Sequence, residues 1–147
     1  MHIWKRDFKP EDLNNDDFIG TTAQMIGIEV IEIGEREIIA RMPVNEKTKQ
    51  PFGILNGGAS CLLAETICSV AANICIKDEN LFAVGLNLSA HHLSSVRDGH
   101  VYGRAYPRHI GKSTQVWEMD IEDDRKKPVC KVIFTVAVLQ KRQNLKP

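Results

Sequence analysis

A long apolar segment with a single charge constrains the fold of this 147-residue chain more than any other feature. The segment runs from Gln50 to Ile76 and reads QPFGILNGGASCLLAETICSVAANICI, with Glu65 as its one charged residue. A lone carboxylate in apolar surroundings is costly unless it is solvated, paired or neutralised. The pattern predicts a helix from about Gly58 to Ile76, capped by Asn56 and buried on most of its sides.

The length and composition of this predicted helix also fit a membrane span, since 13 of the 18 residues from Ala59 to Ile76 are apolar. Glu65 near the middle and two glycines at the start argue against insertion into lipid. Polar residues are also spread along the helix: Ser60, Thr66, Ser69 and Asn73. We therefore expect a core helix and no interaction with a membrane.

Projection at about 100° per residue divides the predicted helix into two faces. One face carries large apolar side chains: Leu63, Ile67, Val70 and Ile74. The opposite face carries small residues around one carboxylate: Cys61, Glu65, Cys68, Ser69, Ala72 and Cys75. We expect the first face to pack on a sheet and the second to admit a ligand or another helix.

The rest of the chain predicts strands around this helix. Residues Pro10 to Gln24 indicate one or two short helices, and Gly27–Gly34 with Glu37–Val44 indicates a hairpin that turns at Glu35–Arg36. Four extended segments follow the long helix: Phe82–Leu93, His100–Arg108, Thr114–Glu122 and Pro128–Leu139. The turns between them are predicted at Arg97–Gly99 and Asp123–Lys127. The order is a hairpin, a long helix and a four-strand meander, which is typical of an α+β domain with one antiparallel sheet of about six strands.

Length and composition indicate a single domain over residues 1–147, with an N-terminal helical segment at 1–25 and a frayed tail at 140–147. Lys plus Arg and Asp plus Glu are equal at 19 each, so the charge gives no sign of a nucleic-acid partner. The N-terminus, MHIWKRDFKPEDLNNDD, is too charged for a secretory signal, and we expect a cytoplasmic protein.

The cysteines predict neither a disulfide nor a metal site. Cys61, Cys68 and Cys75 recur every seven residues on one predicted helix, so the helical rise alone separates them by roughly 10 Å. No His/Cys cluster has the spacing of metal ligands. We expect all four cysteines, Cys130 included, to act as small packing residues.

The start of the predicted helix has the chemistry of an anion site. A glycine pair, Gly57–Gly58, offers free backbone N–H groups at the positive end of the helix dipole, and such a site can hold the oxyanion of a carbonyl under attack. Glu65 can act as a nucleophile or as a general base toward water. The two groups lie eight residues, or about 12 Å, apart on one helix and cannot address one carbonyl carbon. A joint role therefore entails a dimer with the active site between the chains.

A structural alternative stays open from these residues. In it, Asn56-Gly57-Gly58 is only a helix cap and Glu65 is a buried, hydrogen-bonded structural acid. The sequence carries no Gly-x-Ser-x-Gly elbow, no P-loop and no GxGxxG fingerprint.

The segment QPFGILNGGASCLLAE resembles the signature of hotdog-fold acyl-CoA thioesterases of the phenylacetate-degradation type, QPFG-x-L-H-G-G-A-S-x-x-L-A-E. The resemblance is strongest to the branch that holds the 1,4-dihydroxy-2-naphthoyl-CoA thioesterase of menaquinone synthesis and the enterobactin-synthesis proofreading thioesterase. It extends over nearly the whole chain, through IWKR, MPV, AVGLNLSAHHLSSVRDGHV and PRHIGKSTQVWEMDI. It implies a helix wrapped in an antiparallel sheet, and dimers that usually form tetramers.

The resemblance also implies roles at the reacting thioester. Gln50 matches a glutamine near the thioester, and Gly57 matches the glycine whose N–H polarises the carbonyl, with Gly58 beside it at the binding site. Glu65 matches the carboxylate that a partner chain contributes as nucleophile or base. Ser69, one turn further on, matches the Ser or Thr that positions this carboxylate or the attacking water.

Three further positions match residues that contact coenzyme A. His92 and Arg97 fall where relatives keep a His and basic residues near the nucleotide end. Lys112 stands where an Arg is usual and is suited to meet a phosphate, although a solvated surface lysine is the commoner case.

Two residues depart from the family pattern. Asn56 replaces the usual His of the HGG motif, which is thought to assist near the thiolate leaving group. Asn can donate a hydrogen bond but does not titrate near neutrality, so we expect activity to be retained without a dependence on this position near pH 6.5. Ser94 stands where relatives often have an Arg, which puts one contact to coenzyme A in doubt.

The sequence thus predicts an acyl-CoA thioesterase acting on an aryl or medium acyl group, with 1,4-dihydroxy-2-naphthoyl-CoA as one candidate substrate. Coenzyme A is part of the substrate, and we expect no metal and no other cofactor. One alternative is a non-catalytic regulator that binds acyl-CoA or an acyl or aryl carrier protein. A hotdog dehydratase is less favoured, because those relatives carry a His/Asp-type pair that the helix lacks.

Overall fold

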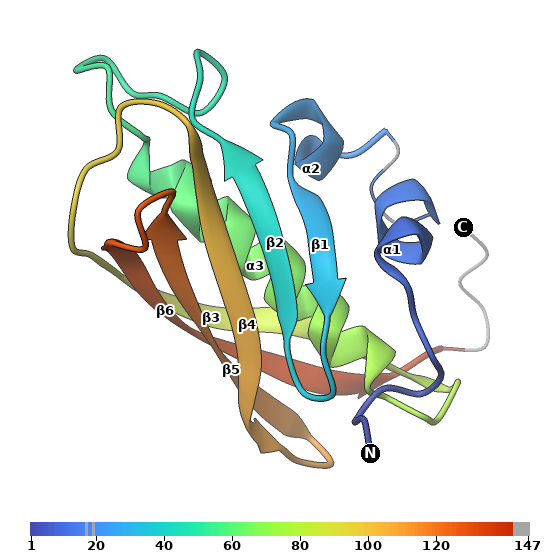
Figure 1. Cartoon of the computed structure of the whole chain (residues 1–147). Coiled ribbons are helices and arrows are strands. Elements are labelled where there is room, and N and C mark those ends of the chain that lie inside the picture. Colours follow the sequence, from blue (N-terminus) through green and yellow to red (C-terminus); the bar gives the residue numbers. More distant parts are fainter. Residues whose placement is uncertain (17, 19, 143–147) are drawn as a thin grey trace.

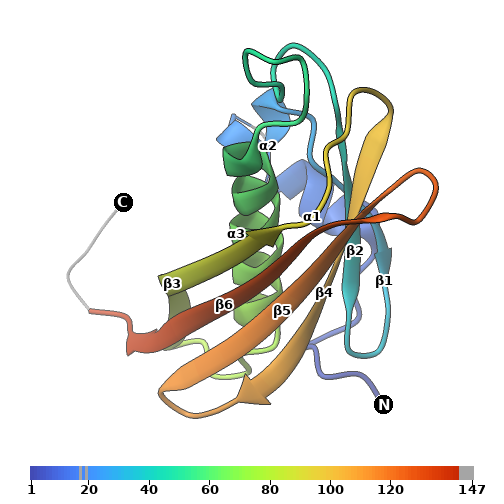
Figure 2. The same ribbon diagram turned by 90° about the vertical axis from the view of Figure 1, so that its left-hand side faces the viewer.

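A single long helix, α3, lies against a curved sheet that wraps around it (Figures 1 and 2). The computed structural model describes residues 1–16, 18 and 20–142. The helices are α1 (Pro10–Asp16), α2 (Thr22–Met25) and α3 (Gly57–Ile74). The strands are β1 (Glu29–Ile33), β2 (Ile38–Pro43), β3 (Leu81–His92), β4 (His100–Ile110), β5 (Thr114–Asp123) and β6 (Pro128–Gln140). This is the hotdog architecture, and the predicted fold class is confirmed.

Helix α3 begins and ends close to the predicted positions, but part of the predicted division of its faces is wrong. Leu63, Ile67 and Ile74 are buried as expected, and Val70 is half-buried. Three residues that the projection placed on the open face are in fact buried: Cys68, Ala72 and Cys75. The buried arc is centred on the small residues, because the concave sheet approaches the helix closely where side chains are short. The open face carries Leu62, Glu65, Thr66, Ser69 and Asn73.

The strand order β1-β2-β4-β5-β6-β3 corrects the predicted four-strand meander. The last three strands do form a meander, but β3 pairs with β6, and β4 pairs with β2. The chain from Leu93 to Gly99 crosses past the helix start, where the N–H of Leu55 donates to the carbonyl of Val96 at 2.8 Å. β4 suits a central position because its inward residues Val101, Gly103 and Ala105 are buried, whereas β3 is largely exposed, as an edge strand is.

The N-terminal helical segment is present as predicted and packs beside β1 (Figure 1). The indole of Trp4 stacks on that of Trp117 with ring centroids 6.3 Å apart, and its Nε1 donates to the carbonyl of Gly34 at 2.7 Å. The predicted frayed tail falls mostly on residues 143–147, outside the described part of the chain. Its first residue, Gln140, still belongs to β6.

Burial distinguishes the predicted core helix from a membrane span for α3. By length and composition alone α3 could cross a membrane, and 44% of that stretch is buried, a combination that core helices of soluble proteins also show. Here its buried face packs on the sheet as the centre of the core. The four cysteines are free, with Cys61 half-buried and the others buried, as expected for packing residues.

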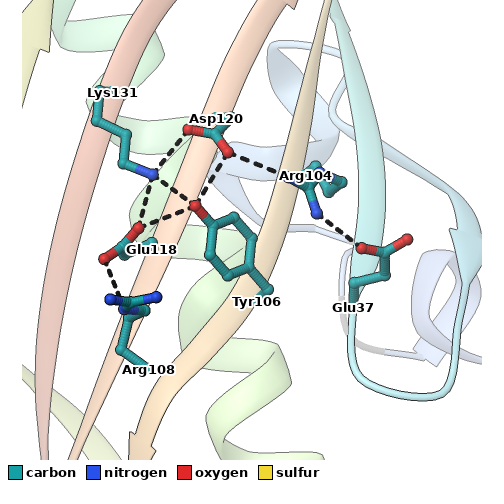
Figure 3. A network of polar contacts seen from close by, with 7 residues as sticks. All are labelled: Glu37, Arg104, Tyr106, Arg108, Glu118, Asp120 and Lys131. Carbon is teal, nitrogen blue, oxygen red and sulfur yellow. Dashed lines mark hydrogen bonds and ion pairs between the residues drawn. The ribbon is translucent and has the colours of Figure 1, made fainter.

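A network of ion pairs covers the outer face of the sheet, away from α3 (Figure 3). The Lys131 Nζ donates to Glu118 at 2.7 Å, to Asp120 at 2.7 Å and to the phenol oxygen of Tyr106 at 2.6 Å. Three outlying pairs extend the network: Arg104–Glu37, Arg104–Asp120 and Arg108–Glu118. The hydrogen bond from Lys131 lowers the pKa of Glu118 below its ordinary value. Lys131 therefore bridges the two carboxylates, which lie side by side on the outer face of β5.

Replacing Lys131 by Met should test this role through the pH dependence of stability. Loss of two short charged hydrogen bonds should lower the free energy of unfolding by roughly 1–3 kcal/mol at pH 7. The folded-state pKa of Glu118 lies below its unfolded value, so its contribution is present above about pH 4.3 and is lost as the pH falls through the folded-state pKa. Urea unfolding should therefore show a difference between wild type and variant that shrinks below about pH 4. Lys127→Met, in the exposed β5–β6 turn, is the matched control, and a difference independent of pH would contradict the account.

Candidate active site

The start of α3 presents one free backbone N–H. Asn56 is extended (φ −69°, ψ 127°), and its Oδ1 accepts a hydrogen bond from the N–H of Gly58 at 2.8 Å. The Gly58 N–H is therefore used by the cap. Within the described residues the N–H of Gly57 has no hydrogen-bond acceptor, as is usual for the first residue of a helix. Of the glycine pair, Gly57 is the one left to bind an oxygen.

The loop before the helix is held by Gln50. Its backbone N–H donates to the carbonyl of Ile54, and its carbonyl accepts from the N–H of Gly53, both at 2.9 Å. Gly53 has a φ of +77°, which the tight turn requires and a side chain would disfavour. The Gln50 Oε1 accepts from the N–H of Phe52, so the side-chain NH₂ is the part left to donate.

Gln50 and Gly57 line the same open pocket of about 360 Å³. Its other walls come from the end of β3 and the crossing segment that follows, including His92, Ser94 and Ser95. Ser94, which stands in place of an Arg, donates from its Oγ to the carbonyl of Pro128 at 2.6 Å and so stays on its own backbone.

His92 reaches this pocket because β3 contains a bulge. The pairing register shifts between Gly85 and Asn87, which leaves Leu86 as an extra residue. Before the bulge, Ala83 and Gly85 face the helix. After it, the alternation of side chains between the two faces of the sheet is shifted by one residue, so Leu88, Ala90 and His92 face the helix. A Cβ built on Gly57 would lie 2.9 Å from the Cε1 and Nε2 of His92, so the imidazole edge covers this glycine.

Glu65 is exposed in the single chain and forms no ion pair with any of the described residues. The alternative of a buried, hydrogen-bonded structural acid is therefore wrong for the protomer. Burial raises the pKa of the Cys61 thiol one turn earlier, and the negative charge of Glu65 adds to this shift. The carboxylate is solvated on the open face of α3, next to the unpaired edge of the sheet.

Gly85, which was not among the predicted site residues, leaves space for this carboxylate. A Cβ at position 85 would lie 2.9 Å from Glu65 Oε1 and 3.0 Å from the ring of Phe134. The signal was available, because an isolated glycine inside a strand pattern often marks a bulge or a close approach.

Three further predicted site residues, Ser69, Arg97 and Lys112, lie at different places in the protomer. Ser69 lies one turn beyond Glu65 on the same open face and lines a second pocket of about 470 Å³. Arg97 is exposed in the crossing segment, at the end of the protomer where α3 begins with Gly57. Lys112 lies in the β4–β5 turn near the other end of α3, where Gln115 meets Cys75. One protomer thus gathers Gln50, Gly57 and His92, and keeps Glu65, Ser69 and Lys112 apart from them.

Comparisons with known proteins agree with this fold. Residues 52–130 match the family model described as the thioesterase superfamily. The chain is 42% identical over 137 residues to a 1,4-dihydroxy-2-naphthoyl-CoA hydrolase of Escherichia coli, which covers 93% of this chain and 99% of that protein. It is 39% identical over 137 residues to a proofreading thioesterase, EntH, of Cronobacter turicensis, with 93% and 98% covered.

Solved structures give the same result. A thioesterase from Haemophilus influenzae superposes with a TM-score of 0.92 at 40% identity and covers 98% of this chain and 99% of its own. A thioesterase from Pseudomonas aeruginosa superposes with a TM-score of 0.91 at 34% identity, with 94% and 99% covered. Together with the family match, the relatives named as thioesterases show that this chain is a thioester hydrolase. The chain belongs to the thioesterase superfamily, in its hotdog branch, as the sequence predicted.

Asn56 should be tested first as a cap. Asn56→Ala removes the acceptor for the Gly58 N–H and should lower the free energy of unfolding by about 1 kcal/mol in urea denaturation. Asn56→Ser, which keeps a capping oxygen, should restore most of this loss. Equal stability of the alanine variant and wild type would show that the cap contributes nothing.

Proposed function

We propose that the protein is an acyl-CoA thioesterase whose active site is completed by two chains. The carbonyl oxygen of the thioester binds the free N–H of Gly57 at the positive end of α3, with the Gln50 amide as a second donor. Glu65 of the partner chain attacks the carbonyl carbon or activates water. The observation that carries the proposal is the spacing of these groups: an unbroken 18-residue helix holds Gly57 and Glu65 about 12 Å apart.

The chemistry is balanced without a metal. If Glu65 is the nucleophile, its oxygen bonds the carbonyl carbon, the C–S bond breaks, and the electron pair leaves on sulfur as the coenzyme A thiolate. Water then hydrolyses the resulting mixed anhydride, which releases the acid and regenerates the carboxylate. If Glu65 is a general base, it takes the proton of the attacking water instead. In both routes the negative charge on oxygen develops at the Gly57 N–H.

The exposed edge of β3 supports a dimer of this kind. It lies at the end of the sheet, with no strand beyond it among residues 1–16, 18 and 20–142, and it exposes Val84 and Leu86. Two copies related by a two-fold axis present the same edge to one another, and edge strands that meet in this way run antiparallel. Opposite ends of the two protomers then meet, so the partner's Lys112 approaches the end that holds Gly57. Tetramers would add a second interface.

The pocket beside Ser69 supports an aryl or medium acyl group. Phe8, Leu13, Val70 and Ile74 give it apolar walls, and its volume of about 470 Å³ exceeds that of a two-ring acyl group. The guanidinium of Arg6 lies 3.9 Å from the centroid of the Phe8 ring at its rim. An aryl thioester such as 1,4-dihydroxy-2-naphthoyl-CoA, the substrate in the name of one relative, is our leading candidate, presented on coenzyme A or on a carrier protein.

Glu65→Gln should lower kcat for benzoyl-CoA or naphthoyl-CoA hydrolysis by roughly 10²–10⁴-fold, because the amide is neither a nucleophile nor a base. Release of free thiol measures the rate, and Glu79→Gln, an exposed acid in the loop after α3, is the matched control. Near-wild-type turnover of Glu65→Gln would refute the mechanism. Binding of these thioesters without hydrolysis by the wild type would favour the non-catalytic regulator.

Mixed oligomers should show that the two groups come from different chains. Glu65→Ala and Gly57→Pro should each be inactive alone. Proline at the first helical position removes the N–H and suits the extended Asn56, while its ring displaces the exposed side chain of His92. Equal amounts, unfolded and refolded together, give heterodimers in half of the molecules, each with one intact site, so about a quarter of wild-type activity should return. No recovery, with mixed dimers present by native mass spectrometry, would place both groups in one chain.

A further inference from the structure

The pocket at the helix start holds an imidazole although the HGG histidine is absent. The Asn56 Oδ1 is held by the Gly58 N–H, which fixes this side chain as a cap. His92 instead brings a ring to within 2.9 Å of a Cβ position on Gly57, with Cε1 and Nε2 as the nearest atoms. The ring is exposed, and none of the described residues hydrogen-bonds to its nitrogens, so they are free for a ligand.

The position of this ring follows from the backbone. His92 pairs with Cys130 of β6, whose side chain is buried on the helix side of the sheet. Its neighbour His91 points to the outer face, because side chains alternate along a strand. Without the extra residue at Leu86 the two histidines would exchange faces.

We propose that His92 is a catalytic residue that hydrogen-bonds to the thioester sulfur as the C–S bond breaks. The inference rests on the proposed function. A carbonyl oxygen bound by the Gly57 N–H lies about 2.9 Å from that nitrogen, and the sulfur is bonded to the same carbonyl carbon. The imidazole of His92, whose edge covers Gly57, is therefore close enough for one of its nitrogens to approach the sulfur. The electron pair of the C–S bond stays on sulfur, and the N–H of His92 stabilises the charge that develops there.

This role differs from a contact with the nucleotide end of coenzyme A, which the family resemblance implied for His92. The experiment compares kcat/KM for benzoyl-CoA, S-benzoylpantetheine, which lacks the nucleotide, and S-phenyl thiobenzoate, whose thiophenol is a far better leaving group. His92→Ala should lower kcat/KM about 10- to 100-fold for the first two thioesters and less than about 3-fold for the third. His92→Gln, which keeps an N–H donor, should recover part of the loss.

His91→Ala, one residue earlier on the outer face, is the matched control and should leave all three values unchanged. A loss for benzoyl-CoA alone would assign His92 to the nucleotide and overturn the proposal. An equal loss for all three, with lowered stability in urea, would make the role merely structural and also overturn it. If the wild type hydrolyses none of the three, the proposed function fails and this inference fails with it; hydrolysis with any other pattern in the variants overturns the inference alone.

Discussion

The rigidity of one helix governs the organisation of this protein. Gly57 and Glu65 are fixed on the same 18-residue α3, and hydrogen bonding along the helix leaves no means of bringing them closer. The sheet curves around α3 and buries the side that faces it, but leaves open the side that carries Glu65. The reactive carboxylate is thus directed away from its own Gly57 and toward the unpaired edge of β3. In the proposed mechanism, a protomer with this geometry contributes one half to each of two reaction centres.

The polar groups around Gly57 form a site of one electrostatic character. Gln50 and Asn56 each carry a carbonyl oxygen and an NH₂ group, and in both the oxygen is already bonded to a backbone N–H of its own loop or helix. What remains for a ligand is a set of donors, together with the positive end of α3. Such a site favours negative charge that develops on oxygen or sulfur. The short turns of the segment therefore contribute to the chemistry as well as to the fold.

Much of this could be predicted from the sequence, for identifiable reasons. The helix, its cap at Asn56 and the extended segments follow from periodicity and local side-chain chemistry, which act over a few residues. Strand order does not, because pairing of β3 with β6 depends on the path of the chain across the start of α3. The burial of Cys68 and Ala72 was not predicted either. The large residues on the helix were expected to face the sheet, whereas a concave sheet approaches the helix closely where side chains are short. The isolated Gly85 could have indicated a bulge or a close approach, but the identity of the neighbour, Glu65, depends on the tertiary structure.

The bulge in β3 divides the strand into two parts that face the helix in different frames. The first part places Gly85 under Glu65, and the second places His92 over Gly57. In the proposed two-fold dimer these two positions would serve different reaction centres, with Glu65 acting on the thioester bound at the partner's glycine and His92 on the thioester bound at its own. The same strand, β3, would then contribute to both centres. In the proposed dimer, a displacement of β3 that accompanies binding at one centre would therefore reach the other centre through the strand.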